Sequence, residues 1–126
     1  MALTMQRKAS GDRHPQTAMI LEALASVYAY QKRFGEAYAL ANEARSVMVE
    51  TFGEASIPAA GALATVALVE QREKRWDKAA ADYETALKVL QAEGVRSDQA
   101  IQDVVSRYRV VMGAMKRKVT LDTSFR

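Results

Sequence analysis

Side chains that commonly carry catalysis or bind metals are sparse in this chain. His14 is the only histidine, and there is no cysteine. A nucleophile–base pair or a typical zinc site would therefore have to use carboxylates alone. His14 stands beside Pro15, in a segment expected to connect two helices, and we interpret it as a linker residue. The six glycines occur singly, so no phosphate-cradling loop is expected. These observations predict a protein that is not an enzyme and that holds no cofactor and no metal.

The positive charge of the chain is concentrated near its C-terminal end. The net charge is +3 over 126 residues, and the segment from residue 107 onward has six basic residues and one acidic residue. That segment carries +5, which leaves −2 for the rest, so nucleic-acid binding along the body is not expected. The basic run at residues 116–118 has two interpretations. Cations favour helix C-termini, or the run docks an acidic partner or RNA.

The apolar content is sufficient for a core but not for a membrane span. Hydrophobic residues make up 49% of the chain, enough for one domain of globular size. No run approaches the roughly 18 to 20 uninterrupted apolar residues of a spanning helix, and charged residues interrupt the first 20 positions, where an export signal would lie. We therefore expect no membrane contact and a cytoplasmic location, although a chain without cysteine also suits a periplasm.

A pattern of two helices recurs along the chain at a constant offset of 42 residues. The clearest marker is a Lys-Arg pair, which begins at Lys32, Lys74 and Lys116. Apolar and small residues keep the same register, as in Ala25 and Ala67. Self-similarity of this kind is typical of a solenoid, in which each unit buries its apolar face by stacking on its neighbours. No alternating strand pattern competes, so the fold class predicted is all-α.

Helix boundaries follow from spacing and from proline, serine and glycine. The first hairpin is expected to begin with Pro15 in the first turn of a helix, to be broken at Gly35 and to end near Gly53. The second begins with Ser56 as N-cap and stops at Gly94. The predicted units are a second helix of a truncated repeat at 1–11, repeats at 14–53 and 56–94, a capping helix at 97–118 and a tail at 119–126.

The hairpins resemble tetratricopeptide repeats of the long, 42-residue variety found in kinesin light chains. The resemblance rests on the large–small–aromatic series Leu24, Ala25 and Tyr28, and on the openings Phe34-Gly35-Glu36-Ala37 and Trp76-Asp77-Lys78-Ala79. The loop at residues 11–15 resembles the Gly-x-x-His-Pro linker of that group. Close helix packing requires small residues, so Ala25 is expected to face Ala37, and Ala67 to face Ala79. The resemblance implies a right-handed α-solenoid of antiparallel hairpins over residues 1–118.

The resemblance also implies a concave groove, lined by the first helix of each hairpin, that takes a peptide or a partner protein. The residues expected to face it are Met19, Glu22, Ser26, Ala29, Tyr30, Gly61, Ala64, Leu68, Gln71, Arg72, Asp103 and Ser106. We predict that a ligand binds across Tyr30, Leu68 and Arg72, because aromatic and arginine side chains supply most hot-spot energy. The alternative is that these are ordinary solvated residues of a spacer repeat. The clamp that grips a peptide's terminal carboxylate in some relatives of this family is not expected, since Glu22, Ser26, Ala64 and Leu68 occupy its positions.

The two ends of the chain depart from the pattern in different ways. Residues 1–11 align with a second helix whose first helix is missing, which suggests a piece of a longer array and self-association through the N-terminal end. In the third copy the small position is Arg109 and the aromatic position is Lys118. The last helix is therefore expected to be a solvated cap. The main hypothesis is a protein–protein interaction scaffold, and the alternative is a nucleic-acid-associated or regulatory module that uses the basic C-terminal end.

Overall fold

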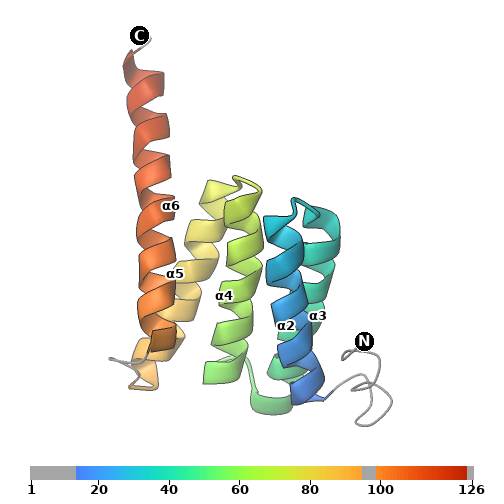
Figure 1. Cartoon of the computed structure of the whole chain (residues 1–126). Coiled ribbons are helices and arrows are strands. Elements are labelled where there is room, and N and C mark those ends of the chain that lie inside the picture. Colours follow the sequence, from blue (N-terminus) through green and yellow to red (C-terminus); the bar gives the residue numbers. More distant parts are fainter. Residues whose placement is uncertain (1–13, 95–98, 125–126) are drawn as a thin grey trace.

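The computed structural model describes residues 14–94 and 99–124, and those residues form helices joined by short turns (Figure 1). Within this part of the chain there is no strand, so the all-α prediction is confirmed. The predicted helix at 1–11 lies outside the described residues. The helices, in chain order, are α2 (Pro15–Tyr30), α3 (Phe34–Phe52), α4 (Ile57–Arg72), α5 (Trp76–Ala92) and α6 (Gln99–Ser124).

Local sequence signals place the helix starts as expected. Pro15 lies in the first turn of α2, and the Ser56 hydroxyl accepts a hydrogen bond from the Ala59 N–H at 3.2 Å as the N-cap of α4. His14 does more than link two helices. Its Nδ1 accepts a hydrogen bond from the Gln16 N–H at 3.1 Å, so His14 is the N-cap of α2. This bond satisfies one of the donors that every helix leaves unpaired at its start.

The turn inside each hairpin is made by a lysine, and the expected break at Gly35 is wrong. Gly35 lies within α3, whereas Lys32 has φ 65° and Lys74 has φ 67°, both in the left-handed region. In the first turn the Arg33 N–H bonds to the Tyr28 carbonyl at 2.8 Å, and the Lys32 N–H bonds to the Ala29 carbonyl at 3.1 Å. The second turn has the same pair of bonds 42 residues later. This is a Schellman motif, and it ends α2 at Tyr30 instead of near residue 33.

Lysine in a left-handed conformation makes these turns improvable. We expect Lys74→Gly to raise the free energy of unfolding by about 0.5 to 1 kcal/mol, because glycine removes the steric cost of positive φ. The control is Lys88→Gly, at an exposed position inside α5, which should lower it by about 1 kcal/mol. Urea denaturation of both variants checks the expectation. A loss of stability in both would show that the turn is not strained.

The helices form two layers. Every helix contacts the next one along the chain, and α4 also contacts both α2 and α6. By contrast, no Cα atom of α3 lies within 8 Å of a Cα atom of α5 among the described residues. The first helices of the hairpins therefore lie side by side, while the second helices stand apart (Figure 1). The small residues predicted at close contacts, Ala25, Ala37, Ala67 and Ala79, are all 0% exposed and belong to one apolar core.

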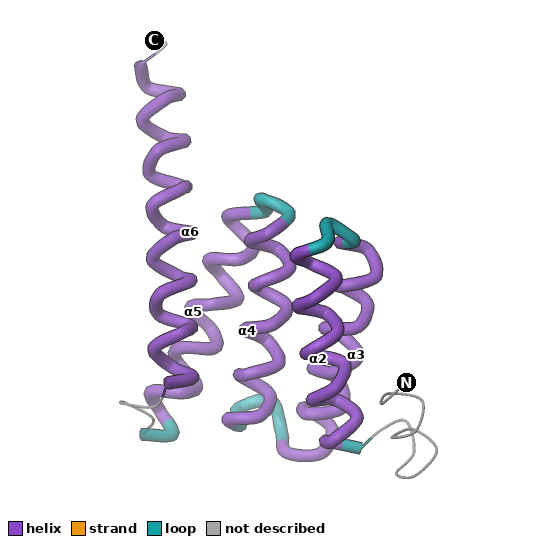
Figure 2. The backbone as a smooth tube through the Cα atoms, in the orientation of Figure 1, coloured by secondary structure: helices purple, strands orange, loops and turns teal. Residues whose placement is uncertain are grey.

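Helix α6 is longer than expected. It covers α5 with an apolar stripe in which Ile101, Val104 and Val111 are buried, and the exposed Arg109 lies off that stripe. The helix continues past Lys118 to Ser124, so the predicted tail at 119–126 is helical as far as residue 124. The third Lys-Arg pair thus lies inside a continuous helix, and α6 projects beyond the ends of α4 and α5 (Figure 2).

Candidate functional site

The sequence-predicted groove residues lie on α2, α4 and α6, the three helices of one layer, but they differ in exposure. Met19 and Tyr30 are 62% and 60% exposed, and Gly61, Arg72, Asp103 and Ser106 are also exposed. Glu22, Ser26 and Gln71 are partly buried. Ala29, Ala64 and Leu68 are buried.

Burial of Leu68 and Ala64 corrects the predicted ligand surface. Leu68 is 5% exposed and Ala64 is 3% exposed, so neither side chain is available to a partner. The reason lies in the position of α4, which has α2 on one side and α6 on the other. Residues in the middle of α4 therefore contribute to the core instead of a groove floor. A ligand that spans Tyr30 and Arg72 cannot use Leu68 between them.

Tyr30 and Arg72 form the most accessible contact among the predicted residues. They occupy the same position in consecutive repeats, 42 residues apart, at the C-terminal ends of α2 and α4. The guanidinium carbon of Arg72 lies 4.6 Å from the centroid of the Tyr30 ring. Stacking of this kind orients both groups before any partner arrives. The pair therefore presents an ordered aromatic and cationic surface.

Two other predicted groove residues are engaged in structural bonds. The Thr65 hydroxyl donates to Glu22 Oε1 at 3.0 Å and so ties α4 to α2. Burial raises the pKa of Glu22, while the hydrogen bond from Thr65 acts in the opposite direction. Gln71 Oε1 accepts a hydrogen bond from the Tyr83 hydroxyl at 2.8 Å, and burial raises the pKa of Tyr83. Tyr83 accordingly remains a neutral donor, and both bonds hold the layer together.

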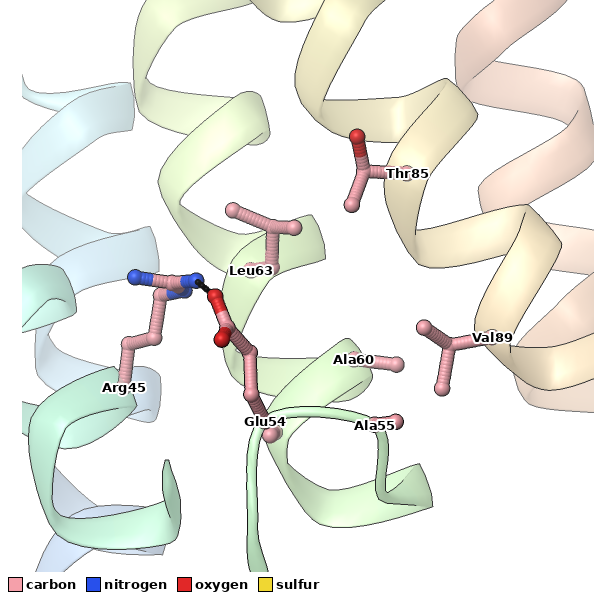
Figure 3. Close-up of a pocket in the computed structure, with 8 residues that line it drawn as sticks. Arg45, Glu54, Ala55, Ala60, Leu63, Thr85 and Val89 are labelled. Carbon is pink, nitrogen blue, oxygen red and sulfur yellow. Dashed lines mark hydrogen bonds and ion pairs between the residues drawn. The ribbon is translucent and has the colours of Figure 1, made fainter. Parts of the chain in front are cut away.

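A pocket on the opposite side of α4 was not predicted from the sequence. It has a volume of about 300 Å³ and lies among α3, the N-terminal half of α4 and α5 (Figure 3). No sequence motif marks it, because its lining comes from three helices and one turn. The residues that line it are Arg45, Glu54, Ala55, Ala59, Ala60, Leu63, Thr85 and Val89.

A buried acid is the second feature that sequence reasoning missed. Glu70 is 0% exposed, and neither of its carboxyl oxygens has a hydrogen-bond partner among the described residues. Its nearest cation is Lys78, with Nζ 3.7 Å from Oε2. Burial and the nearby Asp82 carboxyl raise the pKa of Glu70 to about 8. The repeat register contained a signal, because the equivalent positions are Tyr28 and Met112, and an acid replaces a large side chain there.

Metal and membrane sites were also sought in the described part of the chain. Residues 14–94 and 99–124 contain no group of three or more histidine, cysteine, aspartate or glutamate side chains that could hold a metal ion. None of the helices in these ranges combines the length and the apolar character that crossing a membrane requires. No protein-family model and no curated protein matches the chain.

Proposed function

We propose that the chain is a protein-interaction module of the tetratricopeptide-repeat type, whose hairpins stack as an α-solenoid and bind a segment of a partner protein. Support comes from the 42-residue register, the two equivalent Schellman turns and the contacts of α4 with both α2 and α6. Because α3 and α5 stand apart while α2, α4 and α6 touch, the layer of first helices is the inner one of a curved array.

The observation that carries the functional proposal is the stacked pair of Tyr30 and Arg72. Both side chains are exposed, and they come from neighbouring helices of the inner layer. An ordered arginine binds carboxylates through paired N–H donors, and an aromatic ring buries apolar area at low entropic cost. The partner that fits this surface is an acidic segment with an apolar or aromatic residue beside the acid.

Peptide selection against the whole chain tests the proposal. We expect selected peptides to be acidic and to lose at least about tenfold in affinity for Arg72→Ala, equivalent to about 1.4 kcal/mol. The matched control is Arg33→Ala, because Arg33 also stacks on a tyrosine, with its guanidinium carbon 4.1 Å from the Tyr28 centroid. Binding by titration calorimetry should change less than about twofold in that control. Equal affinities for the wild type and Arg72→Ala would reject the surface.

The structure also bears on the alternative function at the basic end. Residues 116–118 lie inside α6 and more than one turn before Ser124, and the last turn of α6 contains no basic residue. Pairing with the helix C-terminus therefore does not account for this cluster. RNA binding would weaken steeply between about 50 and about 200 mM salt, and replacing residues 116–118 with alanine would abolish it. Binding that is insensitive to salt would favour the protein-interaction surface.

A further inference from the structure

The pocket among α3, α4 and α5 exists because the two outer helices are bridged at one end only. Near the start of both helices, Lys78 Nζ donates to the Tyr38 hydroxyl at 3.0 Å across the gap. At the level of Arg45 no such bridge fills the space, and the floor consists largely of small side chains, Ala59 and Ala60. Figure 3 shows Arg45 approaching from α3, with Thr85 and Val89 on the opposite wall.

One cationic group lines this otherwise apolar pocket. Arg45 Nη2 lies 3.4 Å from Glu54 Oε1, and the Glu54 side chain is 80% exposed. Arg45 Nε is buried and has no hydrogen-bond partner among the described residues. A long contact with an exposed acid contributes little, whereas an unsatisfied buried donor is costly. Arg45 is therefore free to exchange Glu54 for a carboxylate that uses both nitrogens.

We propose that this pocket receives the C-terminal residue of a partner polypeptide, with an aliphatic side chain among Ala60, Leu63 and Val89 and the terminal carboxylate on Arg45. The volume of about 300 Å³ accommodates one large aliphatic residue and not an extended segment. A chain end is the peptide group that carries a carboxylate and an aliphatic side chain on one carbon atom. This second docking site lies on the outer side of the array and is independent of Tyr30 and Arg72.

Titration of the full chain by NMR tests the proposal, with an acetylated tetrapeptide that ends in leucine as probe. We expect the free acid to shift resonances of Arg45, Leu63 and Val89 at millimolar concentration. The same peptide with an amidated end should bind about tenfold more weakly, because the charge-assisted bonds to Arg45 are lost. Hexanoate should bind at least as weakly as the amide, since it lacks the peptide backbone.

Three variants separate the pocket from general charge effects. Arg45→Met keeps the aliphatic stem, and it should reduce the preference for the acid over the amide to about onefold. Glu54→Gln removes the competing carboxylate and should tighten binding of the acid about threefold. Lys88→Met, on the same helix as Thr85 but outside the lining, is the control and should change neither affinity.

The proposal has clear contrary outcomes. Equal binding of acid and amide, or a preference that survives in Arg45→Met, would overturn the role of the carboxylate. Hexanoate binding as tightly as the peptide acid would show that the pocket takes a free fatty acid instead of a chain end. If Arg45→Met fails to fold, Thr85→Trp at the exposed lip serves in its place and should abolish binding of the acid. Unchanged binding in that variant would place the probe elsewhere.

Discussion

Ala67→Trp is expected to unfold the domain or to lower its free energy of unfolding by about 3 kcal/mol or more. Ala67 is 0% exposed and belongs to the same core cluster as Ala79, which is also 0% exposed. Helix α4 is enclosed by four neighbours, because it contacts α2, α3, α5 and α6. A tryptophan at its centre therefore cannot be accommodated by moving one helix outward. Thermal melts followed by circular dichroism provide the measurement.

Ala81→Trp is the matched control for this prediction. It makes the same substitution at an exposed position of α5 and should change stability by about 0.5 kcal/mol or less. His14→Ala is a second comparison. The cap formed by His14 raises its expected cost to about 0.5 to 1 kcal/mol, still well below the effect at Ala67. Comparable losses for Ala67→Trp and Ala81→Trp would contradict the observed packing.

Glu70→Leu is expected to stabilise the domain by about 1 to 3 kcal/mol. The substitution removes a carboxyl group that is buried without a hydrogen bond and replaces it with an apolar side chain of similar volume. Tyr28 and Met112 at the equivalent positions show that the repeat tolerates a large apolar group there. Lys78 retains its bond to the Tyr38 hydroxyl, so the change leaves no cation buried and unpaired. Urea denaturation at neutral pH measures the gain.

The pH dependence of stability tests the same residue independently. The pKa of Glu70 is raised from 4.5 to about 8 by burial first and by Asp82 second. The folded state therefore holds this proton more tightly than the unfolded state. The stabilising contribution is full below pH 4.5, falls as pH rises and is lost above about pH 8, with a slope of at most about 1.4 kcal/mol per pH unit.

Glu70→Gln isolates this effect because glutamine resembles the protonated acid. We expect the wild type to lose stability relative to Glu70→Gln between pH 5 and pH 8. The difference between the two proteins should be smallest in acid. The control Glu93→Gln, at an exposed position after α5, should follow the wild type at every pH. A constant difference between wild type and Glu70→Gln across this range would show that Glu70 ionises as readily as it does in the unfolded chain.

Features decided by neighbours along the chain were predictable from the sequence. The helix starts at Pro15 and Ser56 depend on the first turn alone, and the apolar spacing of each helix reports one buried face. The 42-residue register correctly placed Tyr30 and Arg72 at equivalent positions, and their stacking follows from the contact of α2 with α4. The position of the turn was misjudged, because glycine at residue 35 was given more weight than the hydrogen bonds that a lysine makes at residue 32.

Features decided by packing required the tertiary structure. The Lys-Arg pair forms a turn at Lys32 and Lys74, where a second helix then packs on the first, but at Lys116 it lies within a continuous helix. Leu68 is buried because α2 and α6 both flank α4, which no local pattern shows. The sequence by itself determined the helices and their repeat, since these depend on residues within a few turns. The pocket at Arg45 and the buried Glu70 depend on side chains brought together from separate helices, and only the folded chain defines them.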